Sequence, residues 1–392
     1  MLFVADIAHG KGQKEDKSEA KCYDHNNNEA IRSEVQQIVR RAQKLRVFGS
    51  RHSFNKIADS CGTLLSTLGM NSIIAINGSR PTVTVQPGIT YTDLAPRLCQ
   101  LKMEKKSGIE KTQFPTLAGI AEITVAGATQ TCAHGGGLSN TNLATQVRSM
   151  RIVLANGTEA SFGPESAELR AVACGLGAFG VITEVELNLV PTFDTISYNF
   201  VSLPTESLYE HFDEIQKMGN HVLMLTTFAN NSSSMWDRVT SEANKVQPWY
   251  YGLLQFRLGL SGRDGNLSDL FPQIRSVVAA VVIRTVKGDN LWLSMNNGNG
   301  PTVGIHFSWA DNRPSKANHA LAQIEKVLTK FGARPHWGKY FTMKPSQFLK
   351  SSIYPHLSDF RKLAENLDPT HKFRNKFINE NIFDETAEQI DD

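Results

Sequence analysis

The spacing of apolar residues predicts alternating strands and helices over the first half of the chain. Between residues 30 and 45, apolar side chains recur at helical spacing, so we expect an amphipathic helix that leads into a strand ending at Phe48. Shorter runs of alternating or β-branched residues, closed by glycine and proline, are typical of strands. We predict these strands at 63–66, 73–76, 82–86 and 181–190. Two further helices are predicted at 91–101 and 165–173.

The pattern changes after Pro191, where longer mixed segments replace the short strands and glycine-rich turns. Strand-like runs at 221–226, 277–286 and 303–309 are expected to form an antiparallel sheet. A helix after Pro314 places five apolar residues on one face, which would cover that sheet. Those residues are Ala317, Leu321, Ile324, Leu328 and Phe331. The predicted parts are a polar tail at 1–28, a first domain at 29–190, a cap domain at 191–335 and a C-terminal segment at 336–392.

Composition and charge exclude several classes of protein. The chain has 392 residues and a formal net charge of +3, from 41 basic and 38 acidic residues, so we expect no affinity for nucleic acid or for an anionic membrane. No apolar run approaches the roughly 18 residues of a membrane span, and residues 1–8 lack the basic start of a secretory signal. We therefore expect a cytoplasmic protein.

The cysteines are five in number and widely spaced, at Cys22, Cys61, Cys99, Cys132 and Cys174. Such a pattern indicates neither a disulfide framework nor a Cys-x-x-Cys metal site. We therefore expect reduced thiols and no bound metal.

The first predicted helix and strand lead into a loop rich in glycine, serine and histidine. Gly49 allows a tight turn close to a ligand, and successive N–H groups in such a turn form a concavity suited to phosphate. Ser50 and Ser53 add hydroxyl donors, and Arg51 and His52 lie between them. Taken alone, these residues fit an ordinary surface turn with a solvated histidine better, so a second observation is needed.

A second stretch, residues 123–137, is rich in glycine, alanine and threonine and ends in His-Gly-Gly-Gly. Low side-chain bulk allows a backbone to approach a flat ligand closely, and we expect a loop there rather than a packed element. The residues that would face the ligand are Thr124, Gly127, Ala128, Thr131, His134, Gly135 and Gly137. An isolated loop of this kind is more often part of a plain surface, and it gains weight only beside the His52 loop.

The turn from Gly175 to Gly180 satisfies Gly-x-Gly-x-x-Gly, the fingerprint of NAD-binding folds. That fingerprint must follow a strand and open a helix. Here a predicted helix precedes the turn and a predicted strand follows it, so we reject NAD as the ligand.

The His52 loop resembles the flavin-attachment loop of the alditol oxidases, in the branch of the vanillyl-alcohol oxidase flavoproteins that also contains the sugar-1,4-lactone oxidases. The likeness extends over residues 29–380 and includes the His-Trp-Gly-Lys tetrapeptide at 336–339 and the tail motif around Asn375. The resemblance implies an α+β fold, with a PCMH-type FAD-binding domain of two α/β subdomains at 29–190 and an antiparallel-sheet cap.

The same resemblance implies that FAD is the cofactor and that it is bonded covalently to the imidazole of His52. It places the glycine-rich turn before residue 181 against the adenosine portion of FAD. The further cofactor-binding residues that it implies are Gly177, Gly180, Ile182, His336 and Asn375.

The segments around Arg284, His306 and Lys339 resemble motifs of the same family, and the chemistry of alcohol oxidation suggests a role for each residue. Removing a hydroxyl proton and a hydride leaves negative charge on the alkoxide and then on the reduced flavin, and fixed cations lower that barrier. We assign this role to Arg284 and Lys339, and we assign proton handling to His306, because an ordinary pKa of about 6.5 suits either direction. The alternative interpretations are a cation on the sheet surface for Arg284, a core histidine for His306 and a structural role for Lys339.

Three candidate substrate positions, Gly119, Val282 and Ser308, decide which alcohol is expected. Alditol oxidases have a glutamate where this chain has Val282 and a serine where it has Gly119, and both side chains would hydrogen-bond a polyol. We expect a monomer that oxidises an alcohol group of a polyol or sugar-like small molecule, with molecular oxygen as the acceptor. An aldonolactone oxidase, a dehydrogenase that uses another acceptor, and a flavin-binding protein without catalysis remain alternatives.

Overall fold

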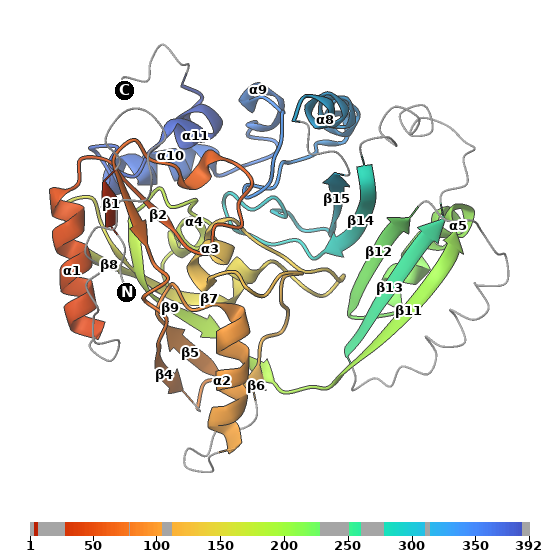
Figure 1. Cartoon of the computed structure of the whole chain (residues 1–392), viewed down its shortest axis with the longest axis horizontal. Helices are drawn as coiled ribbons and strands as arrows, with labels where there is room; N and C mark the ends of the chain where they lie inside the picture. Colours follow the sequence, from red (N-terminus) through yellow and green to blue (C-terminus); the bar gives the residue numbers. More distant parts are fainter. Residues whose placement is uncertain are drawn as a thin grey trace.

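The chain folds into two parts, a first part built from small sheets and helices and a cap built on one twisted sheet (Figure 1). In this computed structural model the described residues are 4–6, 28–77, 79–103, 112–227, 251–259, 278–309 and 314–385. The short strand β10 (Val190–Pro191) lies just before the chain enters the cap, and it pairs antiparallel with the earlier short strand β6 (Thr112–Gln113). No helix in the described ranges is long and apolar enough to cross a membrane.

The first part begins with a three-stranded sheet in the order β1-β3-β2. Strand β2 (Leu45–Phe48) pairs in parallel with β3 (Thr63–Ser66), and β1 (Val4–Asp6) pairs antiparallel with β3. Residues 4–6 therefore form a strand within the segment predicted as a polar tail, because an apolar run of this length is too short to reveal a strand. Residues 7–27 lie outside the described ranges.

Helix α1 (Asn28–Arg41) confirms the helical spacing read from the sequence. Its buried residues Ile31, Val35 and Val39 pack in one cluster with Leu45 of β2. Phe373, more than three hundred residues later, is fully buried in the same cluster, so the C-terminal segment closes this part of the core. Burying each of these side chains stabilises the fold by about 1.5–3 kcal/mol.

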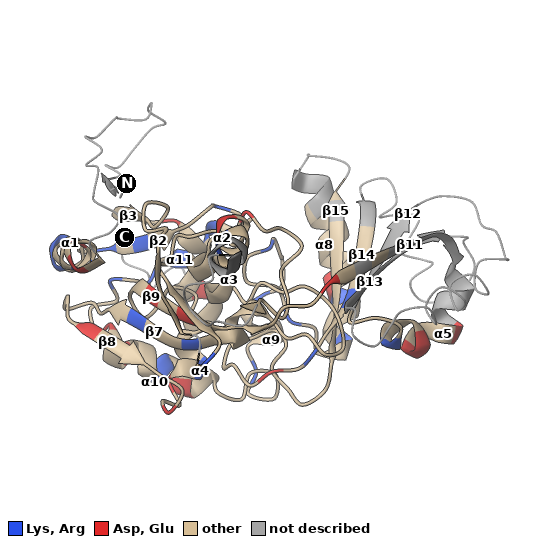
Figure 2. Ribbon diagram, turned by 90° about the horizontal axis from the view of Figure 1, so that it is seen from below, with Lys and Arg blue, Asp and Glu red and all other residues tan. Residues whose placement is uncertain are grey.

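A five-stranded antiparallel sheet in the order β4-β5-β9-β7-β8 forms the rest of the first part. Its strands are β4 (Ile73–Asn77), β5 (Thr82–Val85), β7 (Val147–Val153), β8 (Glu159–Phe162) and β9 (Val181–Asn188). The alternation predicted for β9 is confirmed by its alternating burial, whereas β7 and β8 were not predicted. Acidic and basic residues are interspersed over this part (Figure 2), and Glu184 of β9 pairs with Arg32 and Arg151.

The helices of this part are α2 (Tyr91–Met103), α3 (Val125–Gln130) and α4 (Leu169–Val172). Helix α2 was predicted, and α4 is shorter than predicted but does precede the glycine-rich turn and β9. Helix α3 lies where the sequence predicts a loop, because the Thr124 hydroxyl caps it by accepting a hydrogen bond from the Gly127 N–H at 3.2 Å.

The His-Gly-Gly-Gly segment after α3 is irregular and buried, so the prediction that it does not pack is wrong. At Gly137 the backbone φ is +124°, and an added Cβ atom would lie 1.8 Å from the carbonyl oxygen of Asn220. The Gly137 N–H donates to the Thr285 carbonyl at 2.6 Å. Glycine therefore serves here to let the first part touch the cap.

Cys132 and Cys174 form a disulfide with their Cα atoms 5.7 Å apart, so the prediction of reduced thiols is wrong for this pair. Both residues are fully buried, and the bond joins the end of α3 to the turn before β9. Cys61 is a free, exposed thiol. Cys22 and the side chain of Cys99 lie outside the described part. Pairing across 42 residues cannot be deduced from one sequence.

The cap sheet has the order β11-β13-β12-β14-β15. Its strands are β11 (Thr195–Pro204), β12 (His221–Thr227), β13 (Tyr251–Gly259), β14 (Val278–Val286) and β15 (Thr302–Trp309), and α5 (Thr205–Lys217) follows β11. The predicted antiparallel pairing is confirmed for β12, β14 and β15. Strands β11 and β13 were not predicted, and β13 pairs in parallel with both β11 and β12.

Helix α8 (Pro314–Leu328) covers one face of this sheet, as predicted. Ala320 and Ile324 pack against Val281 of β14. Phe331, which was predicted on the same face, is 80% exposed because α8 ends first and the chain turns through the short helix η3 (Thr329–Phe331). The side chain of Ala317 lies outside the described residues.

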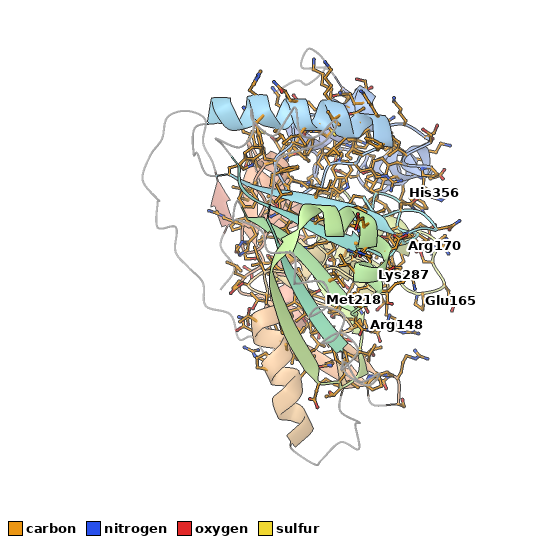
Figure 3. All side chains as sticks on the ribbon, turned by 90° about the vertical axis from the view of Figure 1, so that its right-hand side faces the viewer. Arg148, Glu165, Arg170, Met218, Lys287 and His356 are labelled. Carbon is orange, nitrogen blue, oxygen red and sulfur yellow. A yellow bond between two sulfur atoms is a disulfide. The ribbon has the colours of Figure 1, made fainter. Side chains whose placement is uncertain are left out.

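The C-terminal segment returns from the cap to the first part. It contains α9 (Pro345–Phe348), α10 (Leu357–Leu367), α11 (Lys376–Ile378) and the π-helical turn η4 (Asn379–Phe383). Trp337 is fully buried, and its indole N–H donates to the Leu293 carbonyl at 2.7 Å. Figure 3 views the molecule from the cap side, with Lys287 labelled just past the end of β14. The backbone N–H of Lys287 donates to the Asn140 carbonyl at 2.9 Å, which fixes this end of β14 on the first part.

Candidate active site

A cavity of about 550 Å³ opens between the His52 loop, α3, the turn before β9, and strands β14 and β15. Its size is that of a site for a cofactor together with a small ligand. The predicted cofactor residues in its wall are Gly49, Ser50, Arg51, His52, Ser53, Thr124, Gly127, Ala128, Thr131, His134, Gly177, Gly180, Ile182 and His336. The predicted catalytic residues Arg284, His306 and Lys339 line the same cavity, as does Gly119.

Five predicted site residues lie outside this wall. Gly135 and Gly137 are buried behind it, where Gly137 contacts the cap backbone. Asn375 donates hydrogen bonds to the carbonyls of residues 56, 57 and 59 at 2.9, 3.2 and 2.8 Å, so it holds the short helix η1 (Lys56–Ala58) rather than facing the cavity. Val282 is half-buried nearby, and the side chain of Ser308 lies outside the described residues.

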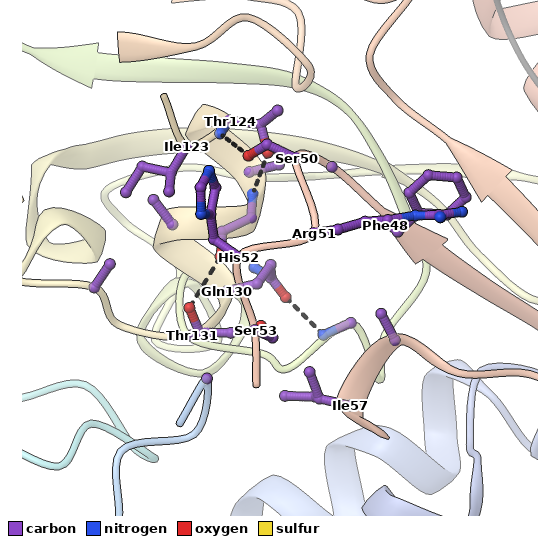
Figure 4. Close-up of a pocket in the computed structure, with 18 of the residues that line it drawn as sticks. Phe48, Ser50, Arg51, His52, Ser53, Ile57, Ile123, Thr124, Gln130 and Thr131 are labelled. Carbon is purple, nitrogen blue, oxygen red and sulfur yellow. Dashed lines mark hydrogen bonds between the residues drawn. The ribbon is translucent and has the colours of Figure 1, made fainter. Parts of the chain in front are cut away.

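The His52 loop is held against α3 by polar contacts (Figure 4). Ser50 Oγ accepts a hydrogen bond from the Thr124 N–H at 3.1 Å. A Cβ atom at residue 49 would lie 2.0 Å from Thr124 Oγ1, so only glycine allows this approach. Arg51 has a backbone φ of +57°, and its guanidinium carbon lies 4.2 Å from the centroid of the Phe48 ring. The side chain of the next residue, His52, is exposed in the cavity wall.

Asn55 ties this loop to the C-terminal segment, and sequence reasoning had given it no role of its own. Its amide donates to the carbonyls of Trp337 and Lys339 at 2.7 and 2.8 Å. The Phe54 N–H donates to the Gly338 carbonyl at 2.9 Å. The two motifs, almost three hundred residues apart, therefore form one wall of the cavity.

Arg46 is a second residue that sequence reasoning missed. Its buried guanidinium donates to the carbonyls of Leu176, Gly177 and Phe373 at 2.9, 3.0 and 2.6 Å, and also to the carbonyl of Ile57. Burial lowers the pKa of Arg46 to about 10, and the carbonyl acceptors satisfy its charge. An arginine inside an otherwise apolar strand was the signal available in the sequence.

Two predicted catalytic residues, Arg284 and His306, lie with the predicted substrate residue Val282 on one face of the cap sheet. Val282 of β14 lies directly opposite His306 of β15, and Arg284 lies two residues further along β14, so all three share the face that α8 does not cover. The ring centroid of His134 lies 5.5 Å from that of His306 and 5.6 Å from that of His336. Three imidazoles and two cations therefore surround one end of the cavity.

The hydrogen bonds of two of these histidines indicate their tautomers. His134 Nδ1 lies 2.8 Å from the Gly135 carbonyl, so Nδ1 carries the proton and Nε2 is free to accept. His336 Nδ1 accepts a hydrogen bond from the Gly338 N–H at 3.0 Å, so its proton is on Nε2. An accepting Nδ1 means that the ring of His336 is neutral in this arrangement.

Burial lowers the pKa of all three histidines. Desolvation and the nearby cations reduce the pKa of His134 to about 4 and that of His306 to about 3, and the pKa of His336 is lowered well below its usual range. Near neutral pH these residues are uncharged hydrogen-bonding groups. The prediction that His306 has an ordinary pKa is wrong, because the sequence did not reveal its burial beside Arg284 and Lys339.

Arg284 and Lys339 supply the positive charge at the end of the cavity where the three histidines lie. Burial lowers the pKa of Arg284, and burial together with Arg284 lowers the pKa of Lys339. Lys339 Nζ lies 4.4 Å from the centroid of the Phe54 ring. A Cβ atom at Gly119 would lie 3.1 and 3.2 Å from the terminal nitrogens of Arg284, so this glycine lies directly against the guanidinium.

The donor set fits FAD. The His52 loop and the residues before α3 offer hydroxyls and backbone N–H groups of the kind that bind a pyrophosphate. Arg284 and Lys339, which line the same cavity, are cations of the kind that would stabilise the negative charge of a reduced flavin. Residues 26–163 match the family described as FAD binding domain, and residues 263–381 match D-arabinono-1,4-lactone oxidase.

Curated relatives match over most of their length. An alditol oxidase from a Streptomyces species is 28% identical over 83% of this chain and 88% of its own. An L-gulono-1,4-lactone dehydrogenase from Mycobacterium tuberculosis is 31% identical over 88% and 91%. The L-gulonolactone oxidase of Mus musculus is 24% identical over 89% and 93%.

Solved structures show the same fold. A cholesterol oxidase from Brevibacterium sterolicum superposes with a TM-score of 0.64 at 12% identity, covering 89% of this chain and 92% of that one. The 6-hydroxy-D-nicotine oxidase of Arthrobacter nicotinovorans superposes with a TM-score of 0.57 at 14% identity, covering 88% and 89%. With these likenesses added to the cavity geometry, the chain belongs to the alditol oxidase and aldonolactone oxidase branch of the vanillyl-alcohol oxidase family of FAD-dependent oxidoreductases.

Proposed function

We propose that this protein oxidises an alcohol carbon of a polyol or sugar-like molecule, with hydride transfer to FAD and with molecular oxygen as the final acceptor, which yields hydrogen peroxide. The observation that carries the proposal is the meeting of Arg284 and Lys339 with three neutral histidines in the cavity that also contains the His52 loop. We also propose that the chain acts as a monomer, with the FAD-binding domain at 29–190, the cap at 191–335 and the returning segment at 336–392.

When bound, FAD supplies the hydride acceptor. The chain's own residues would position the alcohol and stabilise the negative charge that forms when its hydroxyl proton leaves. Arg284 and Lys339 are fixed cations in a partly dry cavity, where each has a larger effect than in water. His306, being neutral, would accept a hydrogen bond from the hydroxyl, and His134 Nε2 is a second acceptor because Nδ1 is committed to the Gly135 carbonyl.

We further propose that His52 forms the covalent bond to FAD. Its side chain is exposed in the cavity wall, and among the residues that the structure describes no hydrogen bond commits its ring. The close packing of the loop on α3 and on the C-terminal segment would hold the imidazole in place.

Anaerobic reduction of the bound flavin by a panel of alcohols tests the function. Polyols or lactones that bleach the flavin, with peroxide formed when oxygen is admitted, would support an oxidase. Bleaching without peroxide would indicate a dehydrogenase with another acceptor. A flavin that no alcohol reduces would indicate the remaining alternative, a flavin-binding protein without this catalysis.

A further inference from the structure

One end of the cavity, which we call the substrate end, contains Arg284, Lys339 and the three histidines, and it has an excess of positive charge. Arg284 and Lys339 are its charged groups near neutral pH, since the three histidines beside them are neutral. The acidic residue in the described cavity wall is Asp59, which is exposed and directly follows η1. Burial lowers the pKa of Arg284, burial and the charge of Arg284 lower the pKa of Lys339, and no carboxylate in the described part of the chain contributes to either shift.

Arg284 has no partner for its charge among the residues that the structure describes. Its buried Nε has no hydrogen-bond acceptor, and no ion pair to its guanidinium exists within the described ranges. Arg46 also has an unpaired Nε, but, in contrast to Arg284, both of its terminal nitrogens donate to backbone carbonyls. A desolvated guanidinium without acceptors is costly unless a ligand supplies them.

The described neighbours of Arg284 do not include an anionic side chain. On its own face of the sheet the adjacent positions are Val282 and Gly304, and across the cavity it meets Gly119. Leu225 of β12 pairs with Val282 on the other side. An apolar strand position and a glycine thus leave the guanidinium open toward the cavity.

We propose that the alcohol oxidised by this protein also carries a carboxylate, and that Arg284 binds this carboxylate through its guanidinium fork. The inference rests on the proposed function and names its substrate class as hydroxy acids. The positive charges of Arg284 and Lys339 would then balance two negative charges. One is the carboxylate of the substrate, and the other is gained by the cofactor when it is reduced. A phosphate ester would bring about −1.5 to −2 by itself, whereas a carboxylate brings one charge and matches the planar fork.

Matched substrates test the proposal. Glycerol and glycerate, or sorbitol and gluconate, differ by replacement of one CH2OH group with COO⁻. Each acid should reduce the flavin of the holoenzyme anaerobically with a kcat/KM about 10- to 100-fold above that of its polyol, because a charged hydrogen bond has this effect. A polyol that reacts as fast as its acid would overturn the proposal and leave the proposed function standing.

Two variants of similar side-chain size separate charge from shape. Val282→Glu places a carboxylate beside Arg284 and should abolish the preference for the acid, whereas Val282→Gln should retain it. Flavin content, measured by absorbance, shows that each variant is folded. Equal preference in both variants would overturn the assignment of Arg284 as the anion site.

A binding measurement does not depend on turnover. Butyrate, which has no hydroxyl, should perturb the absorbance of the oxidised flavin saturably, while its neutral analogue butyramide should require at least about tenfold more ligand. If butyrate binds and neither series of alcohols reduces the flavin, the proposed function fails while the carboxylate site stands. If butyrate binds no better than butyramide, the carboxylate site is overturned.

Discussion

Replacement of Lys339 with methionine tests the electrostatic account of catalysis most directly. Lys339 is half-buried, and its ammonium already has a lowered pKa because of burial and Arg284. A unit charge about 4 Å from an alkoxide interacts by about 4 kcal/mol at an effective dielectric constant of about 20, and by about 1 kcal/mol in water. Loss of the difference, about 3 kcal/mol, predicts that flavin reduction slows by about 100- to 200-fold.

Rapid mixing under anaerobic conditions with saturating substrate measures this step without the reaction with oxygen. Flavin content and unfolding temperature should match those of the unaltered protein, because methionine retains most of the side-chain length over Phe54. Lys350→Met is a matched control, since Lys350 is exposed and outside the cavity wall. Flavin reduction by Lys339→Met at the rate of the control would refute the reasoning, and parallel loss of flavin and activity would instead indicate a structural role.

Three further predictions concern cofactor attachment, packing and pH. Denatured protein should stay yellow, and His52→Ala should release its FAD; colour that washes out of the unaltered protein would contradict covalent attachment. Gly49→Ala should lower both the unfolding temperature and the FAD content, because its Cβ would lie 2.0 Å from Thr124 Oγ1. Gly163→Ala is the control, since its Cβ would meet no atom within 4 Å, and it should change neither quantity. Equal effects of the two variants would show that the close approach at residue 49 is unimportant. The value of kcat/KM should fall as pH rises through the lowered pKa of Lys339, at a pH below the ordinary 10.5, since the ammonium then loses its charge. The buried histidines should add no break between about pH 5 and 8, so a break near neutrality would contradict their assigned neutrality.

The sequence predicted local secondary structure better than it predicted contacts between distant segments. The spacing in α1 and the alternation in β9 report which side of one element is buried, and a single sequence records that directly. The parallel pairing of β13 and the bond between Cys132 and Cys174 depend on partners distant in the chain, which periodicity does not specify.

The sequence likewise predicted some features of the candidate site, while others depend on the tertiary structure. Chemistry and family likeness predicted that Arg284, Lys339 and the His52 loop belong to one cavity, and the structure brings them together. The low pKa of His306 was beyond sequence reasoning, since it arises from burial beside residues of two other segments. Asn375 was predicted to face the cofactor, but its amide is used on backbone carbonyls that its position in the sequence did not reveal.

The contacts of Arg46 and Asn55 set an order of events during protein synthesis. Arg46 needs the carbonyl of Phe373, and Asn55 needs those of Trp337 and Lys339, before the cavity wall is complete. A nascent chain that has emerged from the ribosome only as far as the cap still lacks these partners. We therefore expect FAD to bind only after residue 373 has been synthesised, and a chain truncated before that residue to lack an intact cofactor cavity.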